Sequence, residues 1–279
     1  MRRWNVRAAI LILPAIAAGG ASAHAASHSA KETTDTGKKT TAEPAVDPQA
    51  RDALTRMSEF YKTVPAFALH EDVIHEQVIN SDLKVQKHKT AEVTVRQPDR
   101  LKAVVVADDD KSHTLYFDGK TFTVYMAPHN YYAQMDAPGT TIDALDRAQA
   151  QYGVELPTAS FLALAANNEL ANELTAAGFV GTSHVNGTDA DHYAYRTADV
   201  DYQLWIASGE KPLPLKLVIT SKKLPTQPEY EAVMTWDLTP KIEDSTFAFT
   251  PPADATKIPF GMPPGAQGKK APAEPQKQK

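Results

Sequence analysis

Apolar and polar residues alternate along several stretches of the chain, and this alternation predicts β-strands. Between residues 85 and 95, Val85, Ala91, Val93 and Val95 alternate with glutamine, threonine and glutamate. A strand with one buried face and one solvent-exposed face has this pattern, because successive side chains point to opposite sides. The same reasoning predicts further strands around residues 101–105, 115–117, 122–126, 202–206, 215–219 and 230–236.

Turn-forming residues lie between the predicted strands. Residues 96–99 read Arg-Gln-Pro-Asp, and three aspartates follow at 108–110. Asp118-Gly119 and Asn186-Gly187 are pairs that favour two-residue hairpin turns, since both central positions of such a turn need a positive φ. Neighbouring strands are therefore expected to run antiparallel.

A helix is predicted immediately before the first strands. Asp47 can cap the free amides at the start of a helix, and Pro48 is suited to the first helical position. Apolar residues then recur every three or four positions as far as Val64, which gives one apolar stripe on a charged helix. Pro65 ends it.

Helical spacing returns in the middle of the chain, over residues 141–152 and 157–177. Gly178 is the expected stop of the second of these helices. Long amphipathic strands interrupted by few helices predict an α+β fold, in which the helices cover one face of a curved antiparallel β-sheet.

The first 25 residues have the features of a signal peptide. Three arginines among the first seven residues precede an apolar stretch at 8–18, and small residues continue to Ala25. The apolar stretch contains Pro14 and is shorter than the roughly 20 residues that cross a bilayer. We therefore predict cleavage after Ala23 or Ala25, a soluble periplasmic protein, and no transmembrane segment in the mature chain; an uncleaved anchor is the alternative.

Composition divides the rest of the chain. Residues 26–46 and 261–279 contain few large apolar side chains and cannot bury enough surface to fold. We predict a signal peptide at 1–25, a disordered linker at 26–46, one β-sheet domain at 47–260 and a disordered tail at 261–279.

Charge and cysteine content exclude several classes of protein. The chain contains no cysteine, which excludes disulfides, thiolate metal sites and a lipid-modified cysteine. The net charge is −5 and becomes more negative when the arginine-containing signal peptide is removed. Nucleic acid is not an expected partner, because its binding depends on an excess of lysine and arginine.

No residue pattern indicates catalysis. His70 and His75 are five positions apart, whereas a helical zinc site needs two histidines four apart. Asp189, Asp191 and His192 form the densest acidic and histidine cluster, but strand alternation places the histidine on the opposite face from the aspartates. We predict that the protein is not an enzyme and has no cofactor and no metal site.

Two segments resemble the LolA-like lipoprotein-carrier superfamily. Residues 93–125 share its order of strand, proline turn, strand and Asp-Gly-Lys-Thr hairpin, and residues 247–258 resemble its closing Phe-Thr-Phe-x-Pro-Pro segment. Over residues 46–260 the chain is similar to a family of predicted periplasmic proteins, a domain of unknown function grouped with that fold. The resemblance implies a half-open barrel, a helical lid and a hydrophobic cavity for acyl chains.

The resemblance has one clear departure. In the lipoprotein carriers, an arginine immediately before the turn proline helps to hold the lid closed. This chain has Gln97 at that position and Arg96 one residue earlier. Strand alternation places Arg96 on the opposite face, so a latch of that kind is not expected here.

These observations predict a non-enzymatic periplasmic binding or carrier protein that holds a lipid or acylated ligand in an apolar cavity. Exposing a sixteen-carbon chain to water costs on the order of 12 kcal/mol, at about 0.8 kcal/mol per methylene. The alternative is an envelope interaction or sensor module that binds an envelope protein through the same scaffold without ligand transport. The predicted cavity lining consists of Val93, Val95, Leu101, Phe117, Phe122, Phe161, Leu164, Tyr202, Leu204, Leu217 and Ile219.

Overall fold

The structure is a computed structural model that describes residues 45–109, 111–152, 157–166 and 169–260, without the side chains of 151, 152 and 164. The predicted signal peptide at 1–25 and the predicted tail at 261–279 lie outside the described residues. The predicted linker at 26–46 also lies outside them, except for its last two residues. The domain boundaries therefore remain predictions.

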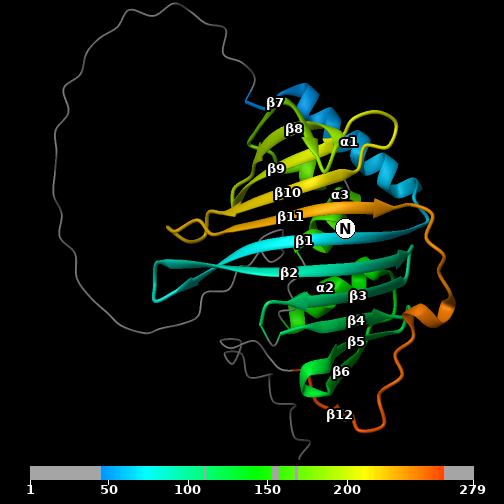
Figure 1. Cartoon of the computed structure of the whole chain (residues 1–279). Helices are drawn as coiled ribbons and strands as arrows, with labels where there is room; N and C mark the ends of the chain where they lie inside the picture. The colour runs from blue at the N-terminus through cyan, green and yellow to red at the C-terminus, as the bar shows by residue number, and fades with distance from the viewer. Residues whose placement is uncertain (1–44, 110, 153–156, 167–168, 261–279) are drawn as a thin grey trace, which may run out of the picture.

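The described chain forms one sheet and a few helices (Figure 1). The helices are α1 (Pro48–Thr63), α2 (Thr141–Tyr152), α3 (Pro157–Ala166) and α4 (Glu169–Asn172), with short 3-10 turns η2 (Ala127–His129) and η3 (Asp244–Phe247). The strands are β1 (Ala66–Ile79), β2 (Leu83–Arg96), β3 (Arg100–Ala107), β4 (His113–Phe117), β5 (Thr121–Met126), β6 (Tyr131–Asp136), β7 (Ala176–Val185), β8 (Thr188–Arg196), β9 (Val200–Ala207), β10 (Pro214–Ser221), β11 (Glu229–Asp237) and β12 (Thr256–Lys257).

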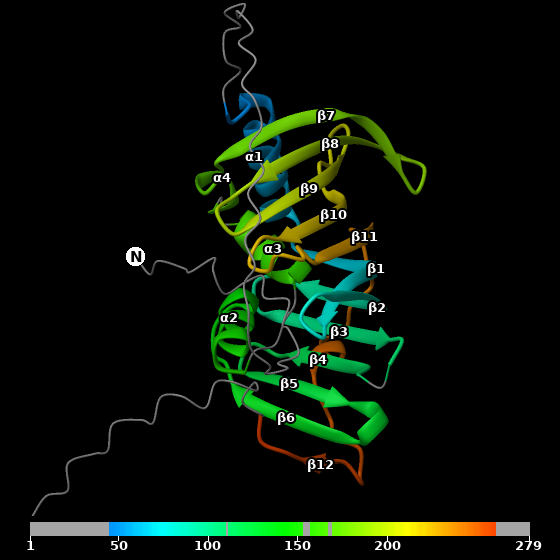
Figure 2. The same cartoon turned by 90° about the vertical axis from the view of Figure 1, so that its left-hand side faces the viewer.

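The sheet has 12 strands in the order β12-β6-β5-β4-β3-β2-β1-β11-β10-β9-β8-β7. Strand pairs are antiparallel, except for the short β12, which runs parallel to β6. The sheet is open, with β12 and β7 at its two edges. Figure 2 shows the helices gathered on one face of this curved sheet. The predicted α+β fold, a curved antiparallel sheet with covering helices, is confirmed.

Local sequence signals account for the first helix and for two of the hairpins. The Asp47 side chain accepts a hydrogen bond of 2.8 Å from the Gln49 amide, and Pro48 is the first residue of α1. At the β7–β8 turn, Asn186 and Gly187 both have positive φ angles, as does Gly119 between β4 and β5. These elements lie where the sequence predicts them.

The helix predicted over residues 157–177 is confirmed in α3 and α4 and is wrong at its end, where residues 176 and 177 form strand. Helix α3 ends at Ala166, α4 ends at Asn172, and β7 begins at Ala176. Gly178, the expected stop of the helix, lies within β7 opposite Ala194 of β8. The ladder between β7 and β8 satisfies the backbone groups of this segment and overrides its local helical preference.

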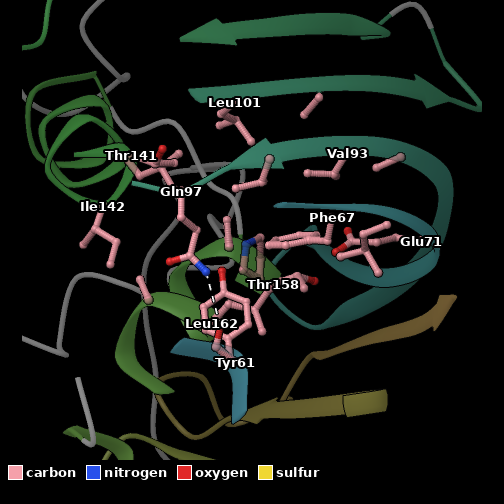
Figure 3. A pocket seen from close by; sticks show the side chains of 18 of the residues that line it. Tyr61, Phe67, Glu71, Val93, Gln97, Leu101, Thr141, Ile142, Thr158 and Leu162 are labelled. Carbon is pink, nitrogen blue, oxygen red and sulfur yellow. Dashed lines mark hydrogen bonds between the residues drawn. The ribbon is translucent and has the colours of Figure 1, made fainter. Parts of the chain in front are cut away.

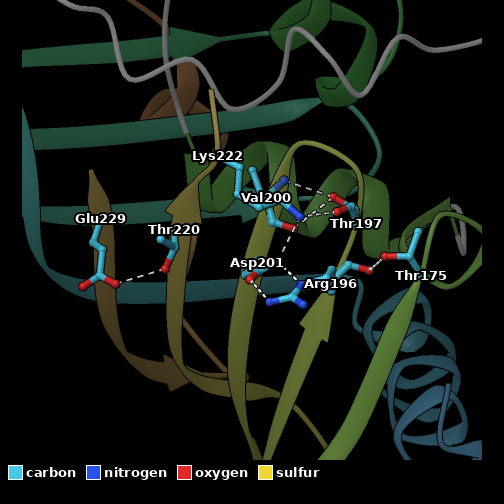
Figure 4. A network of polar contacts seen from close by, with 8 residues as sticks. All are labelled: Thr175, Arg196, Thr197, Val200, Asp201, Thr220, Lys222 and Glu229. Carbon is cyan, nitrogen blue, oxygen red and sulfur yellow. Dashed lines mark hydrogen bonds and ion pairs between the residues drawn. The ribbon is translucent and has the colours of Figure 1, made fainter. Parts of the chain in front are cut away.

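A polar network fastens the outer face of the sheet near β7 (Figure 4). The Arg196 guanidinium donates two hydrogen bonds, of 2.9 and 2.7 Å, to the Asp201 carboxylate, and Lys222 Nζ lies 3.1 Å from the same group. These contacts hold the pKa of Asp201 below its ordinary value. They join β8 and β9 to the residue that follows β10.

Candidate ligand-binding pocket

An apolar cavity of about 180 Å³ lies between the inner face of β1–β3 and the helices α2 and α3 (Figure 3). The sheet contributes Phe67, Leu69, Ala91, Val93, Val95, Leu101, Ala103 and Val105 to its wall, and the helices contribute Ile142, Leu145, Ala159, Leu162 and Ala163. Tyr61, at the end of α1, completes the apolar lining. A concave, mostly apolar site of this kind suits a hydrocarbon guest.

The cavity exists because the inward side chains of β2 and β3 are short. Ala91 pairs with Val105, and Val93 pairs with Ala103. The α3 residues that face them include Ala159 and Ala163. Because the side chains on both sides are small, they leave a gap between the sheet and the helices. Larger residues around the gap keep the two backbones apart, so the gap does not close.

The other half of the inner face is filled with protein. Tyr195 stacks on Tyr202 with ring centroids 4.9 Å apart, and Phe161 of α3 lies edge-on to Tyr202 at 6.0 Å. The Tyr195 hydroxyl donates a hydrogen bond of 3.0 Å to the Ala50 carbonyl of α1. Over β8 and β9, large aromatic side chains and α1 therefore fill the space against the sheet. Over β2 and β3, the corresponding space stays open.

Some of the predicted lining residues lie on the cavity wall, and others lie elsewhere in the core. Val93, Val95 and Leu101 line the cavity. Leu164 belongs to α3, but its side chain lies outside the described part of the structure. The others are buried in the hydrophobic core and do not line the cavity: Phe117, Phe122, Phe161, Tyr202, Leu204, Leu217 and Ile219.

Sequence reasoning missed the contribution of β1 and α2. Phe67, Leu69 and Glu71 of β1 lie on the cavity wall, as do Ile142 and Leu145 of α2. A signal for the β1 positions is present, since Phe67, Leu69, Glu71 and Val73 alternate with Ala68, His70 and Asp72. Because Glu71 is acidic, the alternation did not identify this side of β1 as the inward face.

The turn before β3 anchors two helices over the cavity. Gln97 Nε2 donates hydrogen bonds to the Val64 and Tyr61 carbonyls, at 2.7 and 3.2 Å, at the end of α1. The Thr141 amide donates one of 2.8 Å to the Pro98 carbonyl at the start of α2. Gln97 thus binds to helix backbone at the position where the carriers have their arginine.

Arg96 makes its contacts away from the cavity. Its guanidinium lies 2.6 Å from the Asp244 carboxylate and 5.3 Å from the centre of the Phe247 ring. Both partners belong to η3. Arg96 therefore fastens the segment after β11 to the sheet and takes no part in closing the cavity.

The acidic and histidine cluster of β8 makes surface contacts. Asp189 and His184 are both exposed and lie 2.9 Å apart, and His192 stacks on Trp205 with ring centroids 3.9 Å apart. Among the described residues, no three His, Asp or Glu side chains are arranged to hold a metal ion. A more open hollow of about 410 Å³ is lined by residues of β7, β8, β9 and β10, among them the charged Arg196 and Asp201.

One wall of the apolar cavity is polar. Glu71 is only 7% exposed, and Lys89, Thr158 and Tyr230 lie beside it. Burial raises the pKa of the Glu71 carboxyl to about 7, whereas a hydrogen bond from Thr158 and the charges of Lys89 and His70 lower it. The Thr158 and Tyr230 hydroxyls are 2.9 Å apart. The pocket therefore combines an apolar body with one ionisable group.

Glu71→Gln is expected to make stability less dependent on pH. With a pKa of about 7 when folded against 4.5 as the ordinary value, native Glu71 holds a proton that the unfolded chain has lost, so stability falls as pH rises through this window. The stability advantage of Glu71→Gln over wild type should grow by up to about 3 kcal/mol between pH 4 and pH 8. Urea unfolding of both proteins at the two pH values measures it; an advantage that is equal at both would contradict it.

The family of the chain follows from its sequence as a whole. A family model described as predicted periplasmic protein (DUF2092) matches residues 50–261. The chain belongs to this family. Membership of the DUF2092 family confirms the predicted periplasmic location and the resemblance to predicted periplasmic proteins. No helix in the described ranges has the length and apolar character needed to cross a membrane.

Several solved structures are similar to this DUF2092 family member. Lipoprotein LppX from Mycobacterium tuberculosis is 12% identical, with 71% of this chain and 100% of that chain covered and a TM-score of 0.45. A chain of the MucA/MucB complex from Pseudomonas aeruginosa is 15% identical, with 72% of this chain and 61% of that chain covered and a TM-score of 0.41. A LolA superfamily protein from Nitrosomonas europaea is 8% identical, with 72% of this chain and 97% of that chain covered and a TM-score of 0.35. No curated protein matches the chain significantly.

Proposed function

We propose that this protein is a non-enzymatic periplasmic binding or carrier protein, whose apolar cavity holds the hydrocarbon chain of a lipid or acylated ligand. The observation that carries the proposal is the hollow over β2 and β3. It is lined by apolar side chains from the sheet, α2 and α3. Burial of a hydrocarbon there removes it from water.

The size of the cavity limits how much chain it takes. An apolar cavity of roughly 150 Å³ binds benzene, so about 180 Å³ accommodates a section of about six carbon atoms. At about 0.8 kcal/mol per methylene, that section gains roughly 5 kcal/mol from burial, part of which offsets the cost of association. A longer chain requires the cavity to widen.

Helix α2 is the element whose movement would widen the cavity. Its described hydrogen bonds to the sheet region run from Thr141 to the Pro98 carbonyl and from Arg147 to the Asp136 carbonyl, at 2.8 and 3.1 Å. Apart from these hydrogen bonds, α2 covers the cavity through the apolar side chains of Ile142 and Leu145. Displacement of α2 would leave the strand ladders intact, and a guest would replace the apolar contacts that are lost.

The direct test is native mass spectrometry of the full chain purified from the periplasm, followed by lipid extraction. We expect an apolar guest bound at one per chain. Delipidated protein should also take up a fluorescent fatty-acid analogue. An empty protein that is indifferent to the analogue would overturn the proposal, and its co-purification with an envelope protein would support the interaction module instead.

A further inference from the structure

The burial of a hydrocarbon does not explain why a carboxyl group, that of Glu71, lies in the wall of the pocket. A carboxyl group that is 7% exposed in an apolar pocket is costly unless it is hydrogen-bonded. Thr158 lies on the same part of the pocket wall, and an ionised carboxylate can accept about four hydrogen bonds in all. The pocket thus presents hydrogen-bond acceptors at one place on an otherwise apolar wall. Figure 3 shows Glu71 on one side of the pocket and Ile142 on the other.

Two hydroxyls lie beside Glu71 on the same wall. The Thr158 and Tyr230 hydroxyls are 2.9 Å apart, and either can be the donor of the hydrogen bond between them. A hydroxyl has a single proton to donate, so this pair uses one of its two protons internally. An ionised Glu71 has no proton and only accepts hydrogen bonds. A ligand that pairs with the ionised carboxylate must therefore donate one.

Charge decides which kind of donor fits. The groups whose charges or hydrogen bonds act on Glu71 are Lys89 of β2, the neighbouring His70 and Thr158 of α3; Glu71 in turn acts on Tyr230 of β11. Lys89 already places a positive charge beside the carboxyl, so a ligand ammonium would compete with it. A ligand carboxylate would add a second negative charge next to Glu71, which is unfavourable when both are ionised.

We propose that the pocket takes a single-chain amphiphile with an uncharged, hydrogen-bond-donating head group, an alcohol or an amide, which donates to Glu71 while its hydrocarbon chain extends toward Ile142 and Leu145. This inference rests on the proposed function. It adds that the cavity has a polar end and that Glu71 selects among head groups.

The test is isothermal titration calorimetry of the full chain at pH 8 with octan-1-ol, octanoate and octylamine, which each contain eight carbon atoms and carry different head groups. Benzene serves as a probe without a head group, because the cavity is of the size that holds it. We expect octan-1-ol to bind about tenfold more tightly than octanoate and more tightly than octylamine.

Two variants separate the role of Glu71 from a structural one. Glu71→Gln keeps an acceptor and removes the charge, so the disadvantage of octanoate should shrink to within about threefold. Glu92→Gln is the matched control, since Glu92 lies on the outer face of β2 and contacts His70; it should leave every affinity unchanged. Circular dichroism checks that both variants fold.

The outcomes are distinct. Equal binding of octan-1-ol and octanoate, or an unchanged ratio in Glu71→Gln, would overturn this inference. If benzene still binds in that case, the proposed function stands and Glu71 only anchors α3 to the sheet. If neither benzene nor any of the octyl probes binds, the proposed function itself fails.

Discussion

Phe122→Ala is expected to lower the free energy of unfolding by about 3–5 kcal/mol. Phe122 is fully buried and lies opposite Phe117 across β4 and β5. The loss combines the hydrophobic transfer of the ring with the cavity left behind. Because Phe122 does not line the pocket, the affinity of the folded protein for a hydrocarbon probe should be unchanged. Urea denaturation and titration with benzene measure the two effects.

The control for this prediction is Val93→Ala. Val93 faces a space that is already hollow, so its truncation should cost about 1 kcal/mol or less, while enlarging the pocket and altering the affinity for benzene. A stability loss as large as that of Phe122→Ala would mean that Val93 is as tightly packed as the core, and that the hollow beside it is absent.

Ala103→Phe is expected to abolish ligand binding while leaving the protein folded. Ala103 lies on the cavity wall in β3 and is 5% exposed, and a phenyl ring there occupies most of a benzene-sized space. Loss of roughly 5 kcal/mol of burial for the guest should weaken probe binding by at least about 100-fold. The free energy of unfolding should change by no more than about 1 kcal/mol, because the ring fills an existing gap.

Ala232→Phe is the matched control, with the same substitution placed in solid core. Ala232 of β11 is fully buried in the core cluster and does not line the cavity. Overpacking should cost about 1–3 kcal/mol and leave the affinity of the folded protein unchanged. If both variants were destabilised equally, or if Ala103→Phe still bound the probe, the cavity would not be the ligand site.

Several elements could be predicted because their signals are local. The cap of Asp47 on α1 and the Asn186-Gly187 turn depend on residues within a few positions of each other. The alternation in β9 depends only on the pleat of one strand, and its buried and partly exposed residues follow the predicted order. The α+β fold with one covered face follows from such signals added together.

Two features depended on partners distant in the chain. Residues 176–177 read as helix by themselves, but they form strand because β8 offers them a ladder. The alternation near Glu71 was obscured by charge, yet β1 is the strand that joins the two halves of the sheet, through β2 and β11. In both cases long-range pairing outweighed the local pattern.

For strands such as β2, β3 and β9, the sequence by itself determined which side chains point inward, because alternation is a property of the pleated backbone. Only the tertiary structure decided which inward residues meet empty space. Val93 and Leu217 have the same kind of pattern in sequence, but Val93 lies on the cavity wall and Leu217 is fully buried in the core. The difference is set by which side chains stand opposite each strand, and those come from segments far away along the chain.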